Sequence, residues 1–91
     1  MRRDGVFKAL ADPTRRRILE LLAERDLTAG EIAGHFPIAF ASVSHHLGVL
    51  KGAELVMAER EGQHVRYRLN TTVFQETVQY FIDKLSGGAH A

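Results

Sequence analysis

Apolar residues along this chain recur mostly at helical spacing, with one stretch that alternates as a strand does. Four short helical patterns fill the first half of the chain, and a longer one closes it. Residues 65–69 alternate strictly between apolar and basic side chains, and residues 54–60 become extended before a glycine-containing turn at 61–64. The pattern predicts a mostly α-helical fold with one small β-hairpin, in the order α-α-α-α-β-β-α.

Capping signals mark where the helices begin. Asp12 followed by Pro13 is typical of a helix N-cap and the first helical position. Thr28 and Glu31 fit a capping box at the start of the third helix. Pro37 is expected to end that helix, because the residue before proline avoids the helical region. A short helix, a tight connection and another helix together form the helix-turn-helix layout.

The fourth helix, residues 39–51, has one apolar face and one face of small or polar side chains. The apolar face carries Val43, Leu47 and Leu50, with His46 at its edge as a packing residue. The helix contains no carboxylate. A helix that enters the major groove needs a packed back, slim front residues and no negative charge near phosphates. On periodicity alone an ordinary core helix is favoured, but the hairpin that follows reverses this preference.

A hairpin directly behind a recognition helix is a wing, whose tip can lie along the phosphate backbone or probe the minor groove. The wing residues expected to contact DNA are Arg60, Gln63, His64 and Arg66. Replacing Arg66 by alanine is expected to flatten the salt dependence of binding by about one unit. Arg68 lies nearer the body and is expected to pair with a carboxylate such as Glu59 across the hairpin.

The remaining expected contacts lie on the third and fourth helices. The candidates are Thr28, Phe40, Ala41, Ser42, Ser44, His45 and Lys51. Thr28 is included because the N–H groups that begin the third helix can hold a phosphate. Phe40 either touches a thymine methyl or is partly buried. Arg15, in the second helix, is expected to pair with Asp12, whereas Arg16 and Arg17 are either solvated or in contact with phosphate.

An apolar stripe on the last helix predicts a partner surface, because a chain this small has little core left to cover it. A symmetric dimer is favoured, since the two-fold pair is the commonest oligomer. The alternative, packing against the chain's own core, stays open for about half of this face. The residues expected at the dimer interface are Val6, Leu10, Phe74, Val78, Phe81, Ile82 and Leu85.

Composition bounds these predictions. The 91 residues, 45% hydrophobic and 25% charged, predict one domain, 1–91, with a flexible tail at 86–91. A net charge of +1 requires any basic surface for nucleic acid to be local. No apolar run is long enough to span a bilayer and no signal peptide is recognisable, so a soluble cytoplasmic protein without membrane insertion is expected. There is no cysteine, hence no thiolate metal site or thiol switch.

Several motifs, in this order and spacing, resemble the ArsR family of bacterial winged-helix repressors. The matching segments are 11–19 (ADPTRRRIL), 42–47 (SVSHHL), 50–51 (LK), 61–62 (EG) and 67–70 (YRLN). Within the family, segments 6–10, 28–33 and 69–73 most resemble the SdpR-type autorepressors. The resemblance implies a homodimer that binds an imperfect palindrome in double-stranded DNA and blocks transcription. It also suggests a membrane or other regulatory protein as a further partner.

Many family members release DNA on binding metal or on thiol oxidation, but this chain departs from them. The third helix has no cysteine. The last helix has a single aspartate, Asp83, and the one histidine near it, His90, lies in the expected tail. No cofactor, metal site or inorganic inducer is therefore expected. Five histidines invite an enzymatic interpretation, at His35, His45, His46, His64 and His90. No phosphate loop, serine elbow or acidic pair accompanies them, so no catalytic residue is expected. The remaining alternative is a winged-helix protein-interaction module that does not bind DNA.

Overall fold

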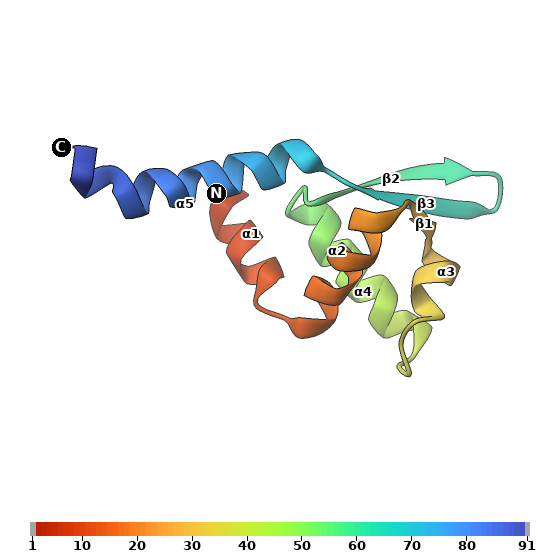
Figure 1. The fold of residues 1–91 in the computed structure, drawn as a ribbon. Helices are drawn as coiled ribbons and strands as arrows, with labels where there is room; N and C mark the ends of the chain where they lie inside the picture. Colours follow the sequence, from red (N-terminus) through yellow and green to blue (C-terminus); the bar gives the residue numbers. More distant parts are fainter. Residues whose placement is uncertain (1, 91) are drawn as a thin grey trace.

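The computed structural model describes the backbone of residues 2–90 and the side chains of residues 5–86. The elements follow the order α1 (Arg2–Leu10), α2 (Pro13–Glu24), β1 (Leu27–Thr28), α3 (Ala29–Ala33), α4 (Phe40–Gly52), β2 (Val56–Glu61), β3 (His64–Leu69) and α5 (Thr71–His90). The hairpin β2–β3 and helix α5 extend in opposite directions from the body formed by α1 to α4 (Figure 1). The winged helix-turn-helix predicted from the sequence is confirmed.

One apolar core joins the first four helices to the base of the sheet. Its largest fully buried side chains are Val6, Ile18, Leu27, Ile32, Val43, Leu47, Leu50, Leu55 and Val56. These residues come from every element except α5 and β3, which add Val73 from α5 and the partly buried Tyr67 and Leu69 from β3. Burying apolar surface at about 25 cal/mol per Å² is the main stabilising contribution to such a core.

The predicted caps of α2 and α3 are confirmed. Asp12 accepts a hydrogen bond at Oδ2 from the backbone N–H of Arg15 at 3.0 Å, with Pro13 at the first helical position. Thr28 and Glu31 form the complete capping box. The prediction that Pro37 ends α3 is wrong, because the helix already ends at Ala33. Tight turns follow it, in which backbone N–H groups after the helix bond to its last carbonyls, as they do at short helix ends.

The sheet has three strands in the order β1-β3-β2, all antiparallel. The sequence predicted the hairpin but not β1, whose two residues are too few to show an alternating pattern. The hairpin turn consists of Gly62 and Gln63 alone, and Gly62 adopts a φ of 59°, which a two-residue turn requires and glycine adopts without strain. Residues 61 and 64, expected in the turn, therefore pair within the strands.

Helix α5 is longer than the sequence predicted. Its helical backbone continues through Ser86 to His90, within the stretch that was expected to be a flexible tail. The Ser86 hydroxyl donates to the carbonyl of Ile82 one turn earlier. Ala91 lies outside the described residues. Within the described part of the chain, no helix has the length and apolar character that crossing a membrane demands.

Candidate nucleic-acid interface

Helix α4 has the two faces that the sequence predicted. Val43, Leu47 and Leu50 are buried in the core. The expected groove contacts are all exposed, namely Phe40, Ala41, Ser42, Ser44 and His45. Lys51 is also exposed, in the last turn of the helix, about 14 Å along the axis from Ser42. The exposed face is narrow and free of acidic groups, so it can approach a phosphate-lined groove without charge repulsion.

A hollow lies between the start of α4 and the hairpin. Five expected contacts line it together, namely Thr28, Phe40, Ser44, Gln63 and His64. Val65 and Tyr67, which the sequence analysis did not select, line the hairpin side of this hollow. Phe40 is 55% exposed, so of its two predicted roles the partly buried one does not hold. The helix-to-wing surface is thus continuous, with an apolar side chain at its tip.

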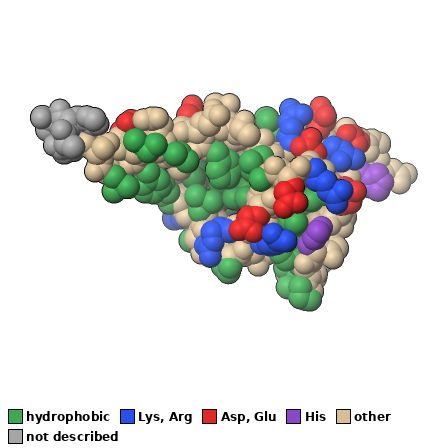
Figure 2. All heavy atoms as spheres, in the orientation of Figure 1, with side chains coloured by type: hydrophobic (Ala, Val, Ile, Leu, Met, Phe, Trp, Pro, Cys, Tyr) green, Lys and Arg blue, Asp and Glu red, His purple; other side chains and the backbone are tan. Residues whose placement is uncertain are grey.

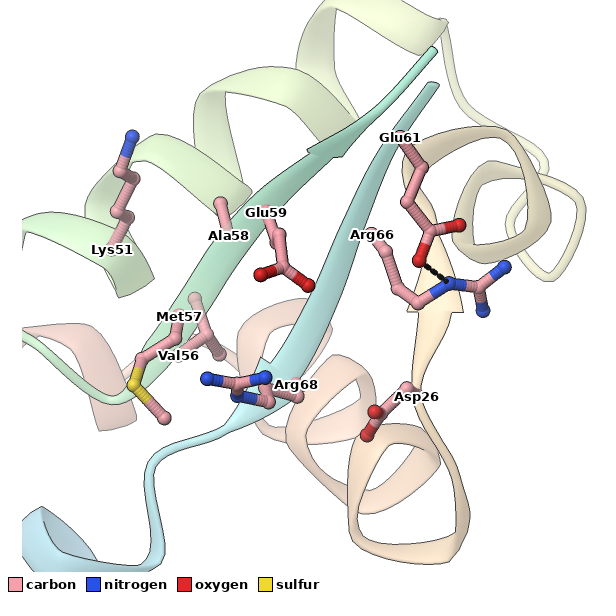
Figure 3. Close-up of a pocket in the computed structure, with 9 residues that line it drawn as sticks. All are labelled: Asp26, Lys51, Val56, Met57, Ala58, Glu59, Glu61, Arg66 and Arg68. Carbon is pink, nitrogen blue, oxygen red and sulfur yellow. Dashed lines mark hydrogen bonds and ion pairs between the residues drawn. The ribbon is translucent and has the colours of Figure 1, made fainter. Parts of the chain in front are cut away.

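The two faces of the hairpin differ in charge and in direction. The register pairs Arg60 with Val65, so Arg60 lies on the face that borders the hollow beside α4. Arg66 pairs with Glu59 and lies on the opposite face. Within this opposite face, Arg66 Nε donates to Glu61 Oε2 at 2.9 Å (Figure 3). The hydrogen bond to Glu61 raises the pKa of Arg66, and it leaves the guanidinium already partnered by a carboxylate.

The predicted pairing of Arg68 with Glu59 is not formed. The register places Met57 opposite Arg68, two pairs away from Glu59. Arg68 has no ion pair with Glu59 among the described side chains, although both line the same shallow hollow (Figure 3). The outer face of the hairpin therefore combines both signs of charge, unlike the acid-free front of α4.

The hydroxyl and the backbone N–H of Thr28 are both hydrogen-bonded to Glu31 at the start of α3. Its hydroxyl accepts from the backbone N–H of Glu31 at 3.1 Å, and its backbone N–H donates to Glu31 Oε1 at 2.8 Å. The hydrogen bond from the Thr28 backbone lowers the pKa of Glu31, so this carboxylate is ionised at neutral pH. A negative charge therefore already sits at the start of α3, where the sequence analysis expected a phosphate.

Two arginines of α2, Arg15 and Arg16, bind backbone carbonyls at the end of α1. The expected Arg15–Asp12 ion pair is not formed between these two described side chains. Arg15 instead donates from Nε to the carbonyl of Ala9 at 2.8 Å and from Nη2 to that of Lys8 at 3.0 Å. Arg16 donates to the carbonyl of Leu10 at 2.7 Å. The positive charges of these two α2 side chains lie at the C-terminal end of α1, where they complement its dipole and satisfy its last carbonyls. Separately, Arg17 pairs with Glu20 at 3.0 Å on the exposed surface of α2.

A second exposed surface runs along α5 and is apolar. Val78, Phe81, Ile82 and Leu85 are 55%, 46%, 52% and 85% exposed. Phe7 of α1 extends this surface, with its ring 5.2 Å from that of Phe81 between centroids. Figure 2 shows the hydrophobic side chains gathered along α5 and the adjacent body. We refer to these five residues as the α5 face.

Three residues expected at the dimer interface are buried or half-buried in the protomer. Val6 is 1% exposed and packs inside the core, so its assignment to an interface is wrong. Leu10 and Phe74 are half-buried against the core. Phe7, which was not among the expected residues, contacts the Phe81 ring and is only partly buried, unlike its neighbour Val6. The described side chains include no group of three or more histidines and carboxylates close enough to hold a metal ion. The side chain of His90 lies outside the described residues.

The exposed α4, the hairpin beside it and the buried helix-turn-helix core define a winged helix-turn-helix protein of the DNA-binding class. Comparison with known proteins agrees. The family described as bacterial regulatory protein, arsR family, matches residues 12–58. The transcriptional repressor SdpR of Bacillus subtilis (strain 168) is 49% identical over 85 residues, which are 93% of this chain and 94% of that protein. This chain belongs to the arsR family and is a winged helix-turn-helix transcriptional regulator.

Other relatives extend the comparison. The regulator CmtR of Mycobacterium tuberculosis is 47% identical over 62 residues, covering 68% of this chain but 52% of CmtR. The crystal structure of an ArsR family transcriptional regulator superposes with a TM-score of 0.88 at 26% identity, over 99% of this chain and 92% of the other. The homodimeric winged helix-turn-helix DNA-binding domain from Mycobacterium bovis gives 0.76 at 30% identity, over 99% and 84%.

Proposed function

We propose that this chain is a dimeric repressor that binds an imperfect palindrome in double-stranded DNA, one α4 helix per half-site. The observation that carries the proposal is the exposed, acid-free front of α4 standing beside the wing. In a two-fold dimer the two α4 helices enter successive major grooves, about 34–36 Å apart. The names of the relatives support this assignment, since SdpR is described as a repressor and the Mycobacterium bovis domain as homodimeric.

Within each half-site, Ala41, Ser42, Ser44 and His45 read the base edges in the major groove. Their side chains are exposed along the front of α4 and short enough for a close approach. Phe40 contacts a thymine methyl, because it is an exposed apolar ring at the tip of the helix. Lys51 contacts a phosphate from the last turn of the helix.

The wing contacts the DNA backbone mainly through its α4-facing side. Arg60, Gln63 and His64 border the same surface as α4 and reach phosphate or the minor groove. Arg66 contributes only after exchanging Glu61 for a phosphate, so its net effect is smaller than that of Arg60. Thr28 contributes little, since Glu31 already satisfies the start of α3.

Two protomers associate through the α5 face. Single apolar residues scattered over a surface are normal, but the α5 face is a continuous exposed patch that includes residues of both α1 and α5. Contiguous apolar patches of this kind mark interaction sites. Leu10 and Phe74, which are half-buried against the core, contribute less than the exposed residues. A symmetric pair buries the same patch of both copies against each other.

Footprinting on DNA fragments, combined with binding measured over a range of salt, tests the proposal. The expected result is protection of two half-sites and an affinity that falls steeply with salt, because phosphate contacts release counterions. A protein-interaction module without DNA binding gives neither result. Protection of one unpaired half-site contradicts the dimer.

Regulation of the repressor by an inorganic ligand is not part of the proposal. A transition-metal sensor needs thiolate, imidazole or carboxylate ligands that converge at fixed positions, and this chain has no thiol. Regulation by expression level or by a further protein is the prediction that follows from the resemblance. Catalysis is likewise not proposed, since the relatives are transcriptional regulators.

A further inference from the structure

Three helices meet at a polar junction on the side of α4 that faces away from the wing. Asp12 caps the start of α2, Arg15 lies in its first turn, and His46 belongs to α4. Arg15 Nη1 lies 3.2 Å from His46 Nδ1, within hydrogen-bond distance. Asp12 Oδ2 lies 3.8 Å from the same nitrogen. The His46 side chain is 17% exposed and that of Asp12 is 32% exposed, so the junction is partly shielded from water. We refer to these three residues as the junction.

The chemistry of the side chains fixes the direction of the hydrogen bond. A guanidinium has donors only, so His46 must accept at Nδ1. The other donors of Arg15 are directed to the carbonyls of Lys8 and Ala9, at the end of α1. One guanidinium therefore connects the end of α1 to the middle of the recognition helix.

Helix α1 is also part of the α5 face. Phe7 contacts the rings of Phe81 and Tyr80, with centroids 5.2 Å and 6.2 Å apart. A chain of contacts therefore runs from the α5 face through α1 and Arg15 to His46 and the exposed front of α4. The apolar packing along this path is not directional, whereas a hydrogen bond to a ring nitrogen is.

We propose that Arg15 and His46 are positioning residues that hold α4 at a fixed angle to α1 and so set the half-site spacing that the dimer accepts. The proposal rests on the proposed function, because spacing has meaning only for two recognition helices joined in a dimer. Each added base pair moves one half-site by about 3.4 Å and turns it by about 34° relative to the other. A dimer in which the two α4 helices keep a fixed separation and angle therefore binds an operator with one base pair added or removed less tightly.

The test compares the wild type and three variants on a set of DNA duplexes. His46→Leu keeps a side chain of similar bulk but removes the acceptor, and it leaves the bonds of Arg15 to α1 intact. His46→Asn is the matched control, because its amide oxygen can accept near the position of Nδ1. His46→Ala is a second variant without an acceptor. The duplexes carry the palindrome that the wild type selects from random-sequence DNA, the same palindrome with one base pair added or removed between half-sites, and a single half-site.

The wild type and His46→Asn are expected to bind the selected spacing at least about tenfold more tightly than the altered spacings. His46→Leu and His46→Ala are expected to lose most of this preference, to about threefold or less, while binding the single half-site as the wild type does. Thermal melting of each variant establishes that it is folded.

Two outcomes overturn the proposal. Retention of the tenfold preference by both variants means that the junction does not set the spacing. An equal loss of affinity for the palindromes and the single half-site means that His46 acts on DNA contact or on folding instead. Failure of the wild type to dimerise or to select a palindrome refutes the proposed function itself. This outcome is seen with the wild type alone, before any variant is compared.

Discussion

Replacing Leu85 by alanine tests the proposed dimer with little disturbance of the protomer, because this side chain is 85% exposed. Burying a leucine completely contributes about 1.5–3 kcal/mol, and nearly all of that contribution is still available at Leu85. A symmetric dimer contains the residue twice. Truncation to alanine is therefore expected to weaken the dimer by roughly 3 kcal/mol, which raises its Kd by about two orders of magnitude.

Sedimentation equilibrium over a dilution series measures this change, and DNA binding in parallel reports its consequence. The matched control is Asp83→Ala. Asp83 lies about 160° around α5 from Leu85, and its described partner is Gln79, 2.8 Å away on the exposed surface. The control is expected to change the Kd of the dimer by less than about threefold, as exposed polar pairs contribute little.

The melting temperature of dilute, monomeric protein separates an effect on dimerisation from an effect on the stability of the protomer. Leu85→Ala is expected to melt as the wild-type protomer does when both are monomeric, since few of its contacts are lost. A dimer Kd that stays within about threefold of the wild type would refute the reasoning, because a residue this exposed and apolar would then lie outside the interface. A change of equal size in Asp83→Ala would point to a general effect on α5 instead.

Three further predictions concern charge and ligands. The hydrogen bond from the Arg15 backbone lowers the pKa of Asp12 in the folded state, so its carboxylate stabilises the fold above the unfolded pKa of about 3.9 and loses this effect as pH falls through the lower folded value. Asp12→Asn keeps a capping oxygen that does not ionise. The amount by which the melting temperature of the wild type exceeds that of Asp12→Asn is therefore expected to decrease between about pH 5 and pH 2. In salt titrations, Arg60→Ala is expected to flatten the slope by about one unit and Arg66→Ala by less, since Glu61 already neutralises Arg66; equal effects would contradict the two-faced wing. Zn(II), Ni(II), Cu(I), arsenite and peroxide at micromolar concentration are expected to leave the DNA complex intact, and release by any of them would overturn the absence of an inorganic inducer.

The helices were predictable because their signals are local. The cap at Asp12, the capping box at Thr28 and the apolar stripe of α4 each lie within a few residues, and all three are confirmed. The ends of α3 and α5 were not predictable in this way. Helix α3 stops at Ala33, where its last carbonyls accept hydrogen bonds from tight turns, whereas α5 continues past Leu85 to His90 without an apolar pattern in the sequence to mark it.

The candidate site was predictable in its residues but less so in its geometry. Strict alternation in residues 65–69 showed that Arg66 and Tyr67 lie on opposite faces of a strand. It could not show which face turns toward α4, because that depends on the pairing of β1 with β3 and on the packing of the sheet. The role of Arg15 was equally hidden, since its partners in α1 come together only when α1 and α2 pack side by side.

The front of α4 makes the dimer geometry decisive for specificity. Two serines, one histidine and one alanine offer few hydrogen bonds to base edges, and a good bidentate contact is worth about 1–3 kcal/mol. One half-site read in this way discriminates weakly. A dimer doubles the number of contacts only when both α4 helices fit their grooves at once, so errors in spacing lose the contribution of a whole half-site. In the proposed complex, such small reading side chains require rigid connections between the α5 face and α4, and Arg15 lies on the path between these two surfaces.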